Sequence, residues 1–136
     1  MEPARFSLVN YRFDKAQIDL DGISPEASFN ISFDPTGIFN QKDSSYQLQF
    51  EFSAVDDMTK RAVIFVRCQA IYLVPGAKTI EDIPAFFYNN AIAILFPYVR
   101  AFVSTLTLQA NVKPFILPTM NLSALQEELK KHTSVL

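Results

Sequence analysis

The 136-residue sequence has no tryptophan, one histidine, one cysteine and three glycines. A single histidine, His132, excludes a histidine metal cluster and argues against a histidine-based nucleophile system. The glycines do not cluster, so the chain has no glycine-rich phosphate loop. The carboxylate pairs at residues 56–57 and 127–128 are typical of a turn and of a solvated helix face. We therefore expect a protein that is not an enzyme and that holds no metal and no cofactor.

Charged residues are also sparse, with 12 lysines and arginines against 14 aspartates and glutamates and a formal net charge of −2. Without a basic block the sequence predicts no nucleic-acid partner. Cys68 lies in an apolar run, which is typical of a buried free thiol. The opening MEPARFSLVNYRF has no basic segment leading into an apolar one, so we expect no signal peptide and a cytoplasmic protein.

Hydrophobic residues, by contrast, make up 49% of the chain, and 13 of them are phenylalanines. They concentrate in residues 80–108, where no charged residue occurs between Asp82 and Arg100. The length and composition predict a long helix that is apolar on nearly every face. Pro97 would remove a hydrogen bond inside this helix, so we expect a kink there.

A membrane span and a pair of buried strands are the alternatives for this stretch. Two prolines, two asparagines and an arginine interrupt the apolar run, and clusters of Lys or Arg are absent from its ends. The β-branched residues from position 99 to 107 fit strands, but the length favours a helix. We therefore expect a core helix and no membrane insertion.

Alternating apolar and polar residues predict four strands ahead of the helix. These strands cover residues 5–21, with a bulge near Asn10, and residues 27–33, 46–54 and 61–74. Residues 34–37, Asp-Pro-Thr-Gly, predict a turn, and residues 38–45 a loop.

The chain after the long helix is expected to be a proline-containing loop at residues 110–119 and then an amphipathic helix that begins near Asn121. The tail at residues 132–136 should fray. Strands first and helices after indicate an α+β fold, a four-stranded antiparallel sheet followed by a long kinked helix and a short C-terminal helix. We expect one domain over residues 1–136.

The apolar helix sets a problem of coverage, because a chain of 136 residues has too little material to surround it and also build a separate core. The strand at residues 61–74 carries apolar side chains on both faces for part of its length, which again calls for cover on two sides. We therefore expect other copies of the chain to bury part of the helix. Arg100 is a lone cation here, either paired or snorkelling, or a ligand contact.

One segment of the helix resembles a motif of a known family. Residues 94–100, Ile-Leu-Phe-Pro-Tyr-Val-Arg, are similar to the Leu-Phe-Pro-Tyr-x-Arg motif of the SecB family of export chaperones. The similarity continues through residues 104–106 to the proline-containing loop, and residues 121–125, Asn-Leu-Ser-Ala-Leu, resemble the start of that family's second helix. The four preceding strands match only as a pattern.

This resemblance implies a homotetramer, built as a dimer of dimers, whose long helices are sandwiched between two sheets. It also implies an ATP-independent holdase that binds unfolded preproteins in long apolar grooves and passes them to the export ATPase SecA. When the groove of the family is transferred to this sequence, the resemblance implies that it is lined by Ile23, Phe29, Phe115, Leu117, Met120, Leu122 and Leu125.

The sequence departs from the family where SecA would bind. Asp19 and Asp21 supply part of an acidic contact surface, but Phe65 stands where the resemblance leads us to expect an acidic residue. The polar, acidic C-terminal tail of the family is also missing from the residues after Leu129. Three readings stay open: an export holdase that uses SecA, a SecB-like adaptor or antitoxin-associated chaperone that serves a dedicated partner, and a carrier of an apolar ligand.

Overall fold

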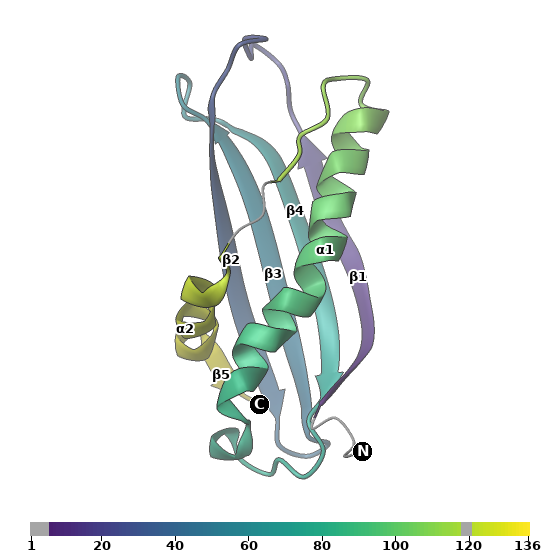
Figure 1. Cartoon of the computed structure of the whole chain (residues 1–136), viewed down its shortest axis with the longest axis vertical. Helices are drawn as coiled ribbons and strands as arrows, with labels where there is room; N and C mark the ends of the chain where they lie inside the picture. Colours follow the sequence, from purple (N-terminus) through teal and green to yellow (C-terminus); the bar gives the residue numbers. More distant parts are fainter. Residues whose placement is uncertain (1–5, 118–120) are drawn as a thin grey trace.

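The computed structural model describes residues 6–117 and 121–136. Its elements follow one another in the order expected for strands first and helices after (Figure 1). They are β1 (Ser7–Ile18), β2 (Phe29–Asn40), β3 (Ser45–Asp56), β4 (Ala62–Leu73), the 3-10 turn η1 (Ile80–Asp82), α1 (Ala85–Gln109), α2 (Ser123–Lys131) and β5 (Thr133–Val135).

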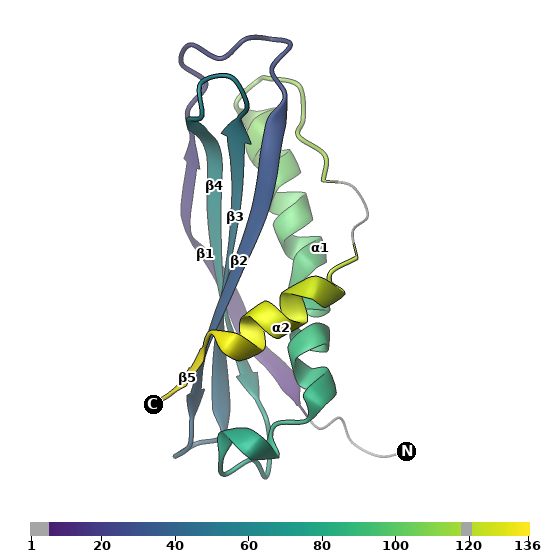
Figure 2. The same ribbon diagram turned by 90° about the vertical axis from the view of Figure 1, so that its left-hand side faces the viewer.

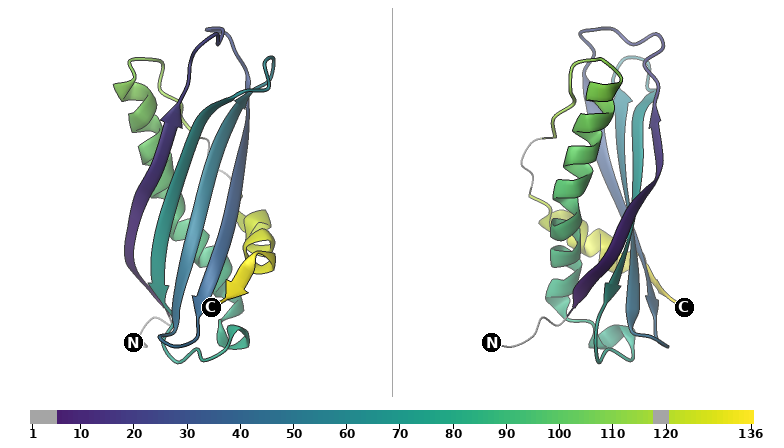
Figure 3. Two further views of the ribbon diagram at one scale, coloured as in Figure 1. Left: turned by 180° about the vertical axis from the view of Figure 1, so that it is seen from behind. Right: turned by 90° about the vertical axis from the view of Figure 1, so that its right-hand side faces the viewer.

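The strands form one sheet in the order β1-β4-β3-β2-β5. The first four strands pair antiparallel, and β5 joins β2 in parallel. α1 runs across one face of the sheet, and α2 lies beside β2 at the edge of the sheet, between α1 and β5 (Figures 1 and 2). Seen from behind, no helix of the described residues covers the other face (Figure 3). The predicted α+β fold is confirmed, with a fifth short strand added.

β1 is an irregular strand, as the change in its apolar phase predicts. Its register against β4 shifts between Leu8 and Asn10 and again between Phe13 and Lys15. Each shift places an extra residue in β1, which bends the strand and re-aims its side chains. Aromatic residues on both sides of the first bulge, such as Phe6 and Tyr11, can therefore pack against the same core.

The turn predicted for residues 34–37 is wrong, because β2 continues to Asn40, and the loop predicted for residues 38–45 is confined to residues 41–44. Pro35 is tolerated in the strand because of the direction in which N–H groups point at this position. Gly37, two residues on, donates its N–H away from β3 to the His132 carbonyl. Pro35 shares that orientation, so the N–H it lacks would have pointed away from β3. Gly37 is required by crowding, since a Cβ there would lie 1.9 Å from the hydroxyl of Tyr46.

The expectation that residues 132–136 fray is also wrong. Leu136 donates its backbone N–H to the Phe39 carbonyl at 2.9 Å, which closes the short pairing of β5 with β2. The hydroxyls of Tyr46 and Thr133 are 2.6 Å apart, and Thr133 donates in turn to the Leu129 carbonyl at 2.7 Å. Burial raises the pKa of Tyr46 and keeps this hydroxyl protonated. A buried polar partner thus fixes a tail that local sequence leaves unspecified.

The long helix begins later than predicted, at Ala85, after the 3-10 turn η1. The Asp82 carboxylate caps the start of η1 by accepting the N–H groups of Lys78 and Thr79 at 2.9 and 3.1 Å. α1 then runs through Pro97 without interruption. By length and composition alone α1 could cross a membrane, but one of its faces packs on the sheet.

The two faces of α1 differ in burial, and both carry large apolar side chains, although the exposed positions also include Asn90, Arg100 and Gln109. The face toward the sheet is buried, and Tyr72 of β4 anchors it by donating its hydroxyl hydrogen to the Ala91 carbonyl at 2.7 Å. Outside this face, four large apolar side chains are between 36% and 59% exposed: Phe86, Ile94, Tyr98 and Leu108. The rings of Phe86 and Tyr98 still lie 6.3 and 4.4 Å from those of Phe6 and Tyr11 at the β1 edge of the sheet.

Candidate functional site

An apolar cleft of about 400 Å³ opens at the end of the sheet where the loop between β1 and β2 approaches the segment after α1. Both segments lie at the top of the molecule in Figures 1 and 2. The cleft is lined almost entirely by apolar groups, and its polar exceptions are Ser24, Thr107 and Lys113. The apolar lining residues are Leu20, Ile23, Pro25, Phe29, Val63, Ile64, Val112 and Phe115.

Three aromatic rings order one side of this apolar cleft. The ring of Phe115 lies edge-to-face against Phe29 at 5.7 Å and against Phe52 at 6.1 Å between centroids. Phe52 is fully buried, whereas Phe29 and Phe115 are half-buried and line the cleft. Such pairs are stabilised by the ring quadrupoles as well as by burial. The rings therefore form a preorganised surface for another apolar or aromatic group.

The segment that carries Phe115 is fixed to α1 by its backbone. The Phe115 N–H donates to the hydroxyl of Thr107 at 2.8 Å, and the Ser104 hydroxyl donates to the Phe115 carbonyl at 3.2 Å. Thr107 is almost fully buried and also donates within the helix, to the carbonyls of Val103 and Ser104. These bonds satisfy a non-helical segment that leaves the helix over an apolar floor.

The opposite wall of the apolar cleft is the loop of residues 19–28. Gly22, at φ +72°, allows the loop to reverse. Its ends are tied to the β3–β4 hairpin, because Asp19 donates its N–H to the Val63 carbonyl at 2.8 Å and Asp57 donates to the Ser28 carbonyl at 2.9 Å. This wall of the cleft is therefore fixed to the hairpin at both of its ends.

The structure brings three of the predicted groove residues, Ile23, Phe29 and Phe115, into the apolar cleft. Leu122 and Leu125 are half-buried on and beside α2 and pack against the core. Of the remaining two predicted groove residues, Leu117 is fully buried in the core, and Met120 lies outside the described residues.

Sequence reasoning missed much of the cleft lining, including Leu20, Pro25, Val112 and Lys113. Leu20 and Val112 sit in segments whose apolar residues could equally belong to the core. Val63 and Ile64 are adjacent in sequence and both buried, and the nearby register shift between Ala54 and Val55 disturbs the alternation of β4 against β3. The two-sided apolar character of this strand was the available indication.

Asp19 and Asp21 are exposed and lie at the start of the same loop. The Asp19 carboxylate accepts the Asp21 N–H at 3.0 Å and lies 3.7 Å from Nη2 of Arg61. Asp14, earlier on β1, is bound by Arg67 through two hydrogen bonds of 3.0 and 3.1 Å. These hydrogen bonds from the guanidinium hold the pKa of the Asp14 carboxyl below its usual range. Phe65 is half-buried, with the Lys15 ammonium 5.4 Å from its ring centroid.

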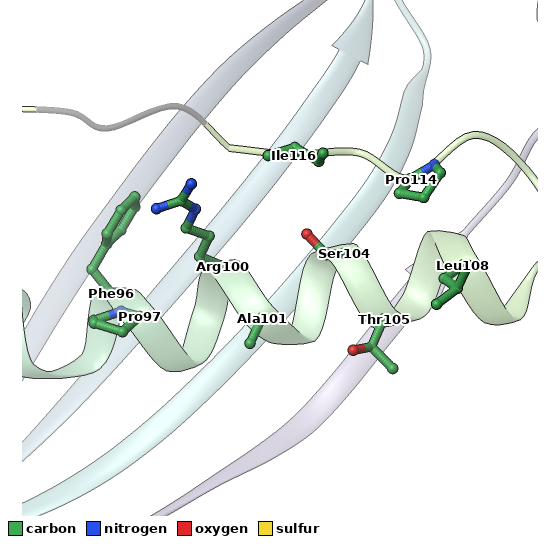
Figure 4. Close-up of a pocket in the computed structure, with 9 residues that line it drawn as sticks. All are labelled: Phe96, Pro97, Arg100, Ala101, Ser104, Thr105, Leu108, Pro114 and Ile116. Carbon is green, nitrogen blue, oxygen red and sulfur yellow. The ribbon is translucent and has the colours of Figure 1, made fainter.

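A second, more open cleft of about 550 Å³ lies between the exposed face of α1 and residues 114–116 (Figure 4). Arg100 extends from the helix into this gap, and Ser104 points toward the segment that carries Ile116 (Figure 4). Within residues 6–117 and 121–136, no carboxylate lies within 4.0 Å of the Arg100 guanidinium. The structure thus places this cation at the rim of exposed apolar surface.

The described part of the chain offers no assembly for covalent or metal chemistry. It holds no group of three or more His, Cys, Asp or Glu side chains that could bind a metal ion. His132 is exposed, with its Nδ1 3.7 Å from the Glu128 carboxylate. Cys68 is buried, and burial raises the pKa of its thiol to about 11. What the clefts can do is remove apolar groups from water.

The sequence and the fold both match one family. The family model described as Preprotein translocase subunit SecB matches residues 14–133. A protein-export protein SecB of Magnetococcus marinus is 30% identical over 119 residues, which cover 79% of this chain and 75% of that protein. An uncharacterized protein of Methanocaldococcus jannaschii is 42% identical over 60 residues, which cover 42% of this chain and 39% of that protein.

Among solved structures, the chain is similar to a Mycobacterium tuberculosis SecB-like chaperone in complex with a ChAD peptide from the HigA1 antitoxin. The TM-score is 0.67 at 18% identity, and the match covers 86% of this chain and 88% of the other. At that identity the likeness concerns the fold. With the match over residues 14–133, it confirms the resemblance noted in the helix motif. The chain belongs to the SecB family, a family of chaperones rather than enzymes.

Proposed function

We propose that this chain is an ATP-independent holdase that binds apolar segments of unfolded proteins in the apolar cleft. The observation that carries the proposal is the cleft itself, about 400 Å³ lined by eight apolar side chains between two backbone-anchored walls. An unfolded chain exposes apolar and aromatic side chains that a folded one hides, so the cleft selects for the unfolded state without hydrolysing a nucleotide.

The free energy of such binding would come from apolar area removed from water, at roughly 25 cal/mol per Å². The edge-to-face contacts of Phe29 and Phe115 leave ring surface that a client aromatic could extend. One side chain in one cleft binds weakly. Several clefts on an oligomer, engaged by one long client, would bind tightly because later contacts form at high effective concentration.

We propose a homotetramer, assembled as a dimer of dimers. Two features support it: the exposed apolar face of α1, and the position of β1 as an edge strand of the sheet. Exposed apolar patches on a helix and unpaired strand edges are both surfaces that proteins cover. A second copy would cover the face that carries Ile94 and Tyr98, which matches the coverage problem set by the sequence.

Besides unfolded clients, the protein has two candidate partners. The similarity to a protein-export SecB supports SecA and a role in preprotein export, with Asp19 and Asp21 as contacts. The similarity to a chaperone bound to an antitoxin peptide supports a dedicated partner instead. The pairing of Asp19 with Arg61 reduces its free charge and favours the second reading over the first. In both readings we propose a cytoplasmic protein without nucleic-acid binding or membrane insertion.

Holdase function is tested by the aggregation of a chemically denatured protein diluted into buffer, followed by light scattering. The wild type should suppress aggregation near stoichiometric ratios. Phe115→Ser should weaken protection, whereas Met58→Ser, at a position 86% exposed and outside both clefts, should leave it intact. No protection by the wild type at several-fold excess would refute the holdase.

The partner is tested separately by pull-down from purified components. Immobilised wild-type protein would be offered SecA and, in a second arm, the antitoxin peptide of the kind bound by the solved relative. Retention of SecA that is lost in an Asp19→Asn, Asp21→Asn double variant supports export. Retention of the peptide alone supports the dedicated partner.

A further inference from the structure

Between its fixed ends, the loop of residues 19–28 is held over the apolar cleft by the packing of Ile23 against the core and by one charged side chain. Between Asp19 and Ser28, its described backbone hydrogen bonds are local, from Ile23 to Leu20 and from Ala27 to Ser24. Arg61 of the β3–β4 hairpin reaches across. Its Nη2 lies 3.7 Å from the Asp19 carboxylate, and its Nη1 lies 3.9 Å from the place a Cβ would occupy at Gly22.

This arrangement leaves charged atoms unsatisfied on both sides of the hairpin. Nε and Nη2 of Arg61 are buried and have no hydrogen-bond partner among the described residues, because the approach to Asp19 is too long for one. Oδ1 of Asp56, a residue only 2% exposed, is likewise without a partner in the described ranges. Buried unpaired polar atoms are costly. Asp56 and Arg61 face each other, with the Asp56 N–H donated to the Arg61 carbonyl at 2.9 Å.

We propose that Arg61 is a two-position latch: paired with Asp19 it holds the loop of residues 19–28 closed over the apolar cleft, and moved to Asp56 it releases the loop. The movement exchanges one carboxylate partner for another, so opening would satisfy the buried Oδ1 of Asp56 while it gives up a 3.7 Å approach to Asp19, whose side chain is 59% exposed. Exposed ion pairs contribute little and are screened by salt, so the closed position is easily left.

The latch deepens the proposed function, because the wall that it would release carries Leu20, Ile23 and Pro25. Movement of that wall would widen the cleft and add apolar contact surface for a bulky client segment. Asp56 is suited to the receiving role because its other oxygen, Oδ2, is already fixed by the N–H and hydroxyl of Thr59 at 3.0 and 2.7 Å. The receiving carboxylate is therefore held in place before the guanidinium arrives.

The test is amide hydrogen exchange of residues 19–28 in three variants of the full chain. Asp19→Asn removes the closing partner and should raise exchange in this loop by about two- to threefold, the scale of an exposed ion pair. Asp56→Asn removes the receiving partner and should lower loop exchange below that of the wild type. Asp14→Asn, which breaks the ion pair between β1 and Arg67 of β4, is the matched control and should leave the loop unchanged.

A salt titration supplies the second readout. Raising the salt concentration should increase loop exchange in the wild type and have no further effect in Asp19→Asn. The latch is overturned if Asp19→Asn leaves loop exchange unchanged, or if Asp56→Asn raises it as Asp19→Asn does. Because exchange needs no client, the expected pattern together with absent holdase activity would refute the proposed function and keep the latch.

Discussion

Both faces of α1 carry large apolar residues, but only the face toward the sheet is buried. Toward the sheet, Leu95 and Val99 are buried at the centre of the core. Away from it, Ile94 and Tyr98, one residue earlier in each case, are more than a third exposed, although the Tyr98 ring still lies 4.4 Å from that of Tyr11 on β1. The helix is apolar on both sides, but one chain supplies cover for only one of them. The apolar content of a sequence thus indicates how much surface must be buried, but it does not indicate whether the same chain or another molecule buries it.

The same division separates the apolar cleft from the core beneath it. The rings of Phe52 and Phe115 pack against each other, but Phe52 on β3 is fully buried, whereas Phe115 lines the apolar cleft. Residues on the inward side should therefore govern the stability of one protomer. Residues on the outward side and in the cleft should govern assembly and binding.

The largest effect is expected from Leu95→Ala on the inward face. Loss of this fully buried side chain should lower the free energy of unfolding by about 2–5 kcal/mol. Chemical denaturation followed by circular dichroism measures it, with Ile94→Ala as the matched control. The comparison of the two faces would fail if Ile94→Ala cost as much as Leu95→Ala at low protein concentration, where assembly contributes least.

The next effect is on assembly, from Ile94→Arg on the outward face. A guanidinium placed in the proposed contact between copies would be desolvated without a partner, so the oligomer should dissociate while the protomer stays folded. Size-exclusion chromatography with circular dichroism distinguishes the two. An unchanged elution volume would show that this face is not an interface.

A smaller effect is expected from Thr107→Val, the polar exception on the inward face. The substitution leaves the Phe115 N–H without its acceptor and should cost about 1–3 kcal/mol. It should also weaken binding in the apolar cleft, because Phe115 would lose its anchor. Thr105→Val, on the exposed side of α1, is the control and should change neither the denaturation midpoint nor client protection.

The smallest effect is kinetic and uses thiol labelling. Because burial raises the pKa of Cys68 to about 11, its thiol should react at pH 8 only when α1 separates from the sheet. A second thiol from Ala101→Cys, on the exposed face, should react rapidly in a dissociated protomer and slowly when a second copy covers it. Mass spectrometry separates the two sites. Equal labelling rates at Cys68 and position 101 would remove the distinction between the faces.

Much of the fold could be predicted because its main elements carry strong periodic patterns. The alternation in β3 and the uncharged run in α1 specify strand and helix whatever the rest of the chain does. The errors fall where long-range contacts override local chemistry. Pro35 and Gly37 indicate a turn locally, but the side chain of Tyr46 and the pairing with β5 hold them in a strand.

The cleft was only partly predictable for a related reason. Ile23, Phe29 and Phe115 were expected through the resemblance to the SecB family, and the structure brings them together. Leu117, from the same proline-containing segment as Phe115, is instead fully buried. Neighbouring apolar residues in a loop point to core or to opening according to backbone geometry, which the sequence pattern does not encode. The contribution of Arg61 likewise depends on a distance across two loops.

The most direct test of the central claim is the molar mass of the wild-type protein in dilute solution, measured by multi-angle light scattering. If other copies cover the outward face of α1, the mass should be that of four chains, and it should fall on Ile94→Arg. A mass of one chain, unchanged at high protein concentration, would contradict the account, because the exposed apolar face would then be stable in water without a partner.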